Sequence, residues 1–176
     1  QGFGQAYGRT VLFLMGTLFS GPVAALAIYA KQVFNAAGVM LLYLRRLELR
    51  AQRPAMQLSV IGQAGITLVG SIAVALAAAR LGVPATVIFA LISWQVIEKL
   101  SATSVYALQL SSRHDLAFTG LLAVTIAGAM GMALAAATSG AVLAFVALET
   151  LGYAAVLVLW AMSRPLGQPL GEAGRP

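Results

Sequence analysis

The sequence predicts an all-α, polytopic transmembrane helical bundle of about six spans, on three observations. Of the 176 residues, 60% are hydrophobic and 9% are charged, and the mean hydropathy is +0.90. A soluble domain has about a quarter of its residues charged, because its surface must face water. The few charges are bunched between uncharged runs of about 20 residues, the length at which a helix crosses a hydrocarbon core of about 30 Å. The apolar and polar alternation of a membrane barrel is absent, which leaves helices as the spanning elements.

Charge and residue usage exclude several classes of function. The net charge of +6 does not indicate nucleic-acid binding, because the arginines lie at the ends of apolar runs, where they orient spans in the membrane. The chain has no cysteine and one histidine, which excludes a disulfide framework, a thiolate or histidine-rich metal site and a cysteine nucleophile. Serines and threonines follow no triad spacing. We therefore expect no enzyme, no catalytic residue, no metal and no cofactor.

Helix breakers and charge clusters divide the chain into six apolar segments. They cover about residues 10–20, 22–44, 57–79, 84–110, 116–137 and 141–162. The first segment is too short to cross a membrane unless residues 3–7 extend it. The bundle is expected over residues 1–164, and residues 165–176 form a Pro/Gly-rich tail. Because the chain begins at Gln1 rather than at Met, we expect a processed or incomplete chain.

The distribution of basic residues favours six spans with both termini in the cytoplasm. Placing the basic loop at 45–53 inside puts Arg9, Arg113 and Arg164 inside as well, and leaves Arg80 alone outside. This is the bias that the positive-inside rule requires. We therefore expect a multi-pass protein of the cell inner (plasma) membrane, in contact with membrane lipids.

Four ionisable residues lie well inside predicted spans, at similar depth near the middle of the membrane: Lys31, Glu98, Lys99 and Glu149. A charge there costs about 2.5–3.5 kcal/mol on insertion scales, so each needs a partner or water. Two positive and two negative charges could neutralise one another. Glu98 and Lys99 are adjacent and point about 100° apart, so we expect them not to pair well with each other and at least one to face another helix, a cavity or a ligand.

Two interpretations of these charges stay open. They could line a hydrated cavity whose lysines bind an anionic head group, or they could form structural ion pairs between helices. In the first interpretation, which we favour slightly, the polar neighbours on the same helices join the site. The candidate substrate-binding residues are then Lys31, Lys99, Glu98, Glu149, Gln32, Asn35 and Gln95.

Three stretches of the chain carry a resemblance to a known family. Residues 18–32, LFSGPVAALAIYAKQ, resemble the short turn and following helix that open the second helix of a lobe in polysaccharide flippases. Residues 104–114, SVYALQLSSRH, are similar to the end of their tenth helix. The turn Thr138-Ser139-Gly140-Ala141 looks like the glycine-rich outer turn of their last helix pair. The chain thus resembles the C-terminal six-helix lobe of a Wzx-like flippase of the multidrug/oligosaccharidyl-lipid/polysaccharide superfamily.

This resemblance implies alternating-access transport of a polyprenyl-linked saccharide, with Lys31 and Lys99 facing its pyrophosphate. The partner would be a second transmembrane lobe, since a two-lobed cavity needs both. The alternative is a non-catalytic transmembrane subunit that packs against another protein in a larger membrane complex. In either case we expect a protein surface to cover the charges at mid-membrane, because lipid cannot satisfy them.

Overall fold

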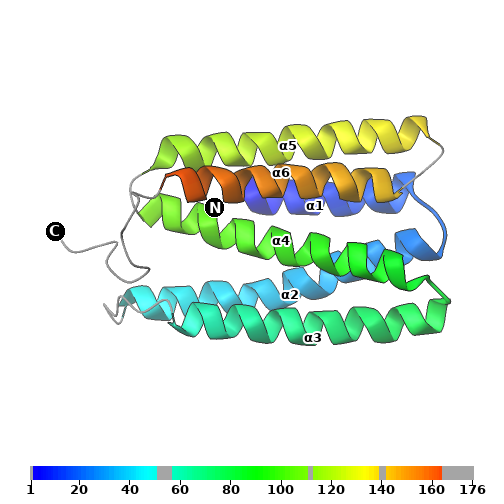
Figure 1. The fold of residues 1–176 in the computed structure, drawn as a ribbon, viewed down its shortest axis with the longest axis horizontal. Coiled ribbons are helices and arrows are strands. Elements are labelled where there is room, and N and C mark those ends of the chain that lie inside the picture. Colours follow the sequence, from blue (N-terminus) through cyan, green and yellow to red (C-terminus); the bar gives the residue numbers. More distant parts are fainter. Residues whose placement is uncertain (1, 51–56, 111–112, 139–141, 164–176) are drawn as a thin grey trace.

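The computed structural model describes residues 2–50, 57–110, 113–138 and 142–163, and this part of the chain forms six α-helices without a strand. The helices lie side by side along the long axis of the molecule (Figure 1). This arrangement confirms the predicted all-α helical bundle. The helices are α1 (Gly2–Leu18), α2 (Pro22–Arg50), α3 (Gln57–Leu81), α4 (Ala85–Leu110), α5 (His114–Ala137) and α6 (Val142–Met162).

Helix α4 lies between two pairs of helices (Figure 1). On one side α6 packs most extensively against α5 and α4, and on the other side of α4 helix α2 pairs with α3. Two glycines bring α5 and α6 together. A Cβ at Gly152 would lie 2.8 Å from Cβ of Ala127, and one at Gly131 would lie 3.0 Å from Cα of Phe145. Such close backbone approach is the usual way for helices to associate in a membrane, where no hydrophobic effect drives them together.

Glycine and proline set the turn between α1 and α2 and the turn between α3 and α4. Gly21, with φ of 91°, precedes Pro22, the first residue of α2. Proline suits that position because the first N–H groups of a helix have no partner within the helix. After α3, Gly82 has φ of 64°, and Val83 donates its backbone N–H to the carbonyl of Ala78. This is a Schellman ending, in which glycine takes the left-handed conformation at no steric cost.

Two helices are longer than the sequence predicted. Helix α1 begins at Gly2 rather than near residue 10, and α2 continues through the expected basic loop to Arg50. Leu, Arg and Glu are good helix formers, and the next breaker after Leu44 is Pro54, so nothing in the basic run ends the helix. The rest of that loop, at 51–53, most of the turn at 138–141 and the tail at 165–176 lie outside the described residues.

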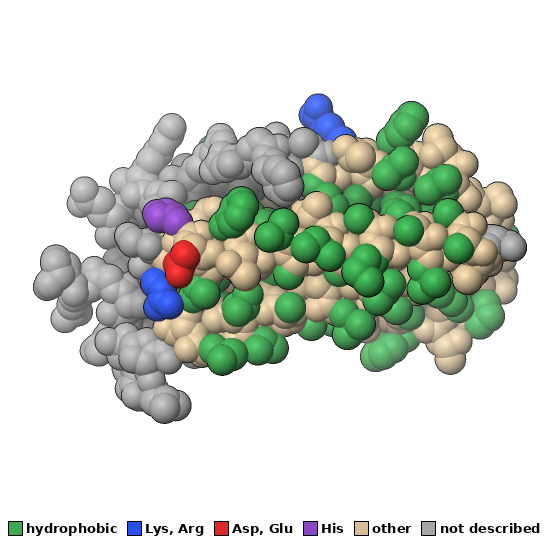
Figure 2. Space-filling model, turned by 90° about the horizontal axis from the view of Figure 1, so that it is seen from above, with side chains coloured by type: hydrophobic (Ala, Val, Ile, Leu, Met, Phe, Trp, Pro, Cys, Tyr) green, Lys and Arg blue, Asp and Glu red, His purple; other side chains and the backbone are tan. Residues whose placement is uncertain are grey.

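Four helices of the described chain are long and apolar enough to cross a membrane, which marks the protein as a membrane protein. They are Gly62–Leu81, Ala85–Gln109, His114–Ala137 and Val142–Met162. Large apolar side chains are exposed on these helices, among them Leu76, Phe89 and Phe118. Figure 2 shows hydrophobic side chains over the visible face, with acidic and histidine side chains only at the end where α5 begins. The spanning role of α1 and α2, and the cytoplasmic placement of both termini, stay predictions.

Candidate functional site: a buried charge cluster beside a pocket

The four ionisable residues at mid-helix come together in one cluster. Lys31 lies on α2, Glu98 and Lys99 on α4, and Glu149 on α6. Lys31 and Glu149 are buried with 1% and 0% of their surface exposed, and Lys99 is buried too. The side chain of Glu98 is 12% exposed. The helices of this one chain therefore cover the charges, which corrects the expectation that a partner surface is needed for that purpose.

Lys31 bridges the two carboxylates. Its Nζ lies 3.1 Å from Oε2 of Glu98 and 3.3 Å from Oε2 of Glu149. The same ammonium sits 4.6 Å from the ring centroid of Trp94, a distance at which a cation is attracted to the face of an indole. One lysine thus holds α2, α4 and α6 together at a single level of the bundle.

Glu98 and Lys99 pair with each other, contrary to the sequence-based expectation. Nζ of Lys99 lies 3.0 Å from Oε1 of Glu98 and 2.8 Å from Oδ1 of Asn35 on α2. The expectation considered only the directions in which adjacent side chains leave a helix. The long, flexible lysine side chain turns back toward its neighbour while both head groups also reach α2. The expectation that at least one of the two residues faces another helix is confirmed, because both reach α2.

Glu149 accepts hydrogen bonds from four side chains. Trp94 donates its indole N–H to Oε2 at 2.7 Å, and Tyr7 of α1 donates its hydroxyl to Oε1 at 2.8 Å. Tyr153, one turn along α6, and Lys31 complete the set at 3.4 and 3.3 Å. Burying a carboxylate is costly unless it is paired and hydrogen-bonded, and this one is both. The cluster holds two positive and two negative side chains and is neutral as a whole.

Of the three polar residues that the sequence associated with the charges, two contact the cluster and one does not. Asn35 binds Lys99, and Gln95 is fully buried with its Nε2 3.3 Å from Oε2 of Glu98. Gln32 is exposed on α2 and adds nothing to the cluster. Sequence reasoning missed Tyr7 and Tyr153. The spacing of Tyr153, four residues after Glu149 on one helix face, is a signal that could have found it.

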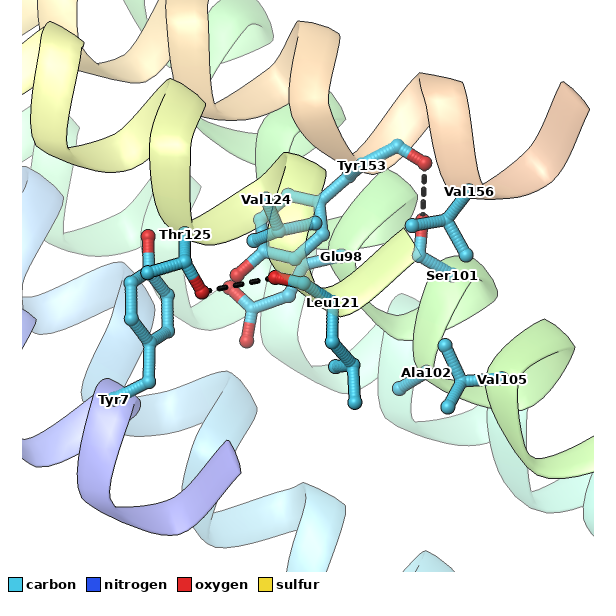
Figure 3. Close-up of a pocket in the computed structure, with 10 residues that line it drawn as sticks. All are labelled: Tyr7, Glu98, Ser101, Ala102, Val105, Leu121, Val124, Thr125, Tyr153 and Val156. Atoms are coloured by element: carbon cyan, nitrogen blue, oxygen red, sulfur yellow. Dashed lines mark hydrogen bonds between the residues drawn. The ribbon is translucent and has the colours of Figure 1, made fainter. Parts of the chain in front are cut away.

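A pocket of about 220 Å³ adjoins the cluster on the side of Glu98 (Figure 3). Residues of helices α1, α4, α5 and α6 line it. Among the four charged residues only Glu98 lines it, and both lysines lie outside. The described structure therefore does not show the expected cavity with lysines on its wall. The lining residues are Tyr7, Glu98, Ser101, Ala102, Val105, Leu121, Val124, Thr125, Tyr153 and Val156.

The described residues hold no group of three or more His, Cys, Asp or Glu side chains that could bind a metal ion. Comparisons of the chain with models of protein families, with curated proteins and with solved structures found no match.

Proposed function

We propose that this chain acts in membrane transport of a lipid-linked saccharide, as one lobe of a transporter that works by alternating access. The observation that carries the proposal is the assembly of four charges from three helices beside a pocket, inside a bundle with an apolar exterior. Ionisable residues within membrane helices are costly and commonly mark a pathway for a substrate. The sequence resemblance supplies the class of substrate.

The ion pairs are the part of this cluster that would change between two transporter states. In the described state each lysine is held by a carboxylate, so an anionic pyrophosphate reaches a lysine only after an ion pair opens. Lys99 is the better candidate, because it is more exposed than Lys31 and contacts one carboxylate instead of two. A second lobe would supply the opposite wall of the transport path, as in transporters that bind substrate between repeats.

A flipping assay tests this function. The protein, expressed from its whole reading frame, is reconstituted in liposomes with a polyprenyl-linked saccharide that carries a fluorophore on the sugar. Access of an impermeant quencher from outside then reports movement across the bilayer. We expect flipping by the wild type and its loss in Lys99→Ala, assayed under conditions in which circular dichroism shows that this destabilised variant is still folded. A fluorescent phospholipid without a saccharide is the control. Flipping no faster than in protein-free liposomes would refute the transport function.

A second function, that of a non-catalytic subunit in a larger membrane complex, is favoured by one observation. The cluster is neutral, and Lys31 and Glu149 are satisfied within the chain, as expected for charges that only fix helix packing. In that case Lys99→Ala changes the stability of the protein and does not change the rate measured in the flipping assay. Crosslinking in intact membranes then yields a constant heteromeric partner, whereas a transporter whose second lobe belongs to the same reading frame yields none.

A further inference from the structure

The pocket beside Glu98 has a lining with one unusual chemical property. Each hydroxyl group in its wall already donates its hydrogen to another protein atom. Ser101 donates to the backbone carbonyl of Tyr153 at 2.7 Å, and Thr125 donates to that of Leu121 at 2.8 Å (Figure 3). Tyr7 and Tyr153 both donate to Glu149. The polar atoms that remain available to a ligand are therefore lone pairs, which accept hydrogen bonds.

Glu98 adds to this set of acceptors. Its carboxylate receives hydrogen bonds from Lys31, Lys99 and Gln95, and it still reaches the pocket with part of its surface. A carboxylate offers about four lone-pair positions, so one remains for a ligand. A ligand for this pocket must consequently bring hydrogen-bond donors.

Charge decides which kind of donor fits. The cluster is already neutral, with the ammonium groups of Lys31 and Lys99 within 3.1 Å of the Glu98 carboxylate. A cationic ligand would add a third positive charge beside two lysines in a medium of low dielectric constant, where that repulsion is poorly screened. A neutral donor adds no charge. Hydroxyl groups meet both requirements.

The remaining wall and the size of the pocket narrow the ligand further. Val105, Leu121, Val124 and Val156 add apolar side chains to the lining, next to its acceptors. A volume of about 220 Å³ is below the ~300 Å³ at which pockets for drug-sized ligands begin, so the pocket holds one small group. A sugar ring combines donor hydroxyls with an apolar C–H face that packs well against such a wall.

We propose that this pocket binds one sugar unit through its hydroxyl groups. This deepens the proposed function, because it assigns the saccharide part of the substrate to a specific site, and it rests on that function only for the origin of the sugar. Glu98 and Thr125 accept hydrogen bonds from the hydroxyls, and the valines cover the C–H face.

Binding of methyl β-D-glucopyranoside, measured by saturation-transfer NMR, tests the proposal. The protein is held in a detergent without a sugar head group, and n-butylammonium is the cationic comparison.

Thr125→Val removes one acceptor at constant shape and should weaken glucoside affinity about threefold to tenfold. Thr119→Val is the matched control, because Thr119 makes the same hydrogen bond to the carbonyl four residues earlier on α5 but is exposed outside the pocket. Ala102→Leu, which narrows the pocket from an exposed position, should abolish the signal.

Three results would overturn the proposal: no saturable glucoside signal, tighter binding of n-butylammonium than of the glucoside, or an equal loss in Thr119→Val and Thr125→Val. The flipping assay separates this proposal from the function itself. Flipping without glucoside binding would refute the proposed sugar site and would still support the transport function. Glucoside binding without flipping supports the site and refutes the transport function.

Discussion

The hydroxyl of Tyr7 in α1 lies 2.8 Å from Oε1 of Glu149 in α6, so the first helix is joined to the last at the level of the buried charges. Helix α1 otherwise packs mainly against α2 and makes few contacts with α5. The tyrosine reaches past Gly128 of α5, where an added Cβ would overlap its hydroxyl. A small residue on one helix thus makes room for a hydrogen bond between two others.

Replacing Tyr7 should weaken the attachment of α1. Tyr7→Phe leaves the buried Glu149 with one donor fewer, which should lower the free energy of unfolding by about 1–3 kcal/mol. Unfolding by SDS titration in mixed micelles measures this change. Tyr29→Phe is the control, because Tyr29 is 39% exposed on α2 and its hydroxyl should contribute less than about 0.5 kcal/mol. Equal stability of the two variants would show that the bond to Glu149 is energetically unimportant.

The contact between α5 and α6 should not tolerate a methyl group at Gly152. Its Cβ would lie 2.8 Å from Cβ of Ala127 and 3.0 Å from Cα of Val124, so backbone would have to move. We expect Gly152→Ala to lower the free energy of unfolding by about 1–3 kcal/mol, as overpacking does. Gly65→Ala, with nothing within 4 Å of the new Cβ, should be neutral or stabilise the helix by up to about 1 kcal/mol. The same SDS titration compares the two, and a stable Gly152→Ala variant would contradict the packing.

The predicted membrane topology can be tested with single cysteines, since the chain contains none. Cysteines at Gln52 and Gln168 should resist a membrane-impermeant thiol reagent in intact cells, because the basic residues near them favour the cytoplasm. Thr138→Cys, exposed at the other end of α5, should react and serves as the positive control. Labelling of Gln52→Cys or Gln168→Cys before lysis would rule out the six-span arrangement.

The helices could be predicted from the sequence because length and hydropathy determine them almost alone. Turns at Gly21 and Gly82 were visible as breakers, and both glycines adopt positive φ in the structure. The start of α1 and the end of α2 could not be placed, because hydropathy reports where a segment is apolar and not where a helix stops. Arg50 illustrates this point, since a charged residue continues a helix as readily as an apolar one.

The charge cluster was partly predictable for a similar reason. Equal depth in the membrane and balanced charge indicated that Lys31 and Glu149 could meet, and they do. The rotation of each helix about its own axis could not be predicted from one sequence. This rotation determines that Glu98 rather than a lysine faces the pocket and that Tyr7 reaches the cluster. Side-chain flexibility, which lets Lys99 turn back to Glu98, was also beyond a rule based on helix geometry.

The stability of the bundle should depend more on the zero net charge of this cluster than on any one of its charged residues. Glu98→Gln leaves Lys31 and Lys99 with Glu149 as the only carboxylate, and Lys99→Met leaves two carboxylates with Lys31. Removal of one member of a buried ion pair costs about 3–5 kcal/mol, because the other charge stays buried without a partner. Each single variant should therefore unfold at a much lower SDS fraction than the wild type.

The double variant Glu98→Gln/Lys99→Met removes one charge of each sign and leaves Lys31 paired with Glu149 at 3.3 Å. Because neutrality returns, we expect it to be more stable than either single variant and to lie within about 1–2 kcal/mol of the wild type. A double-mutant cycle measured by SDS titration gives the coupling energy between the two residues. Lys99→Met combined with Phe89→Leu, an exposed position on the same helix, is the matched control and should show no coupling. If the Glu98→Gln and Lys99→Met effects simply add, the two charges do not compensate each other, and the cluster is not a closed, neutral set.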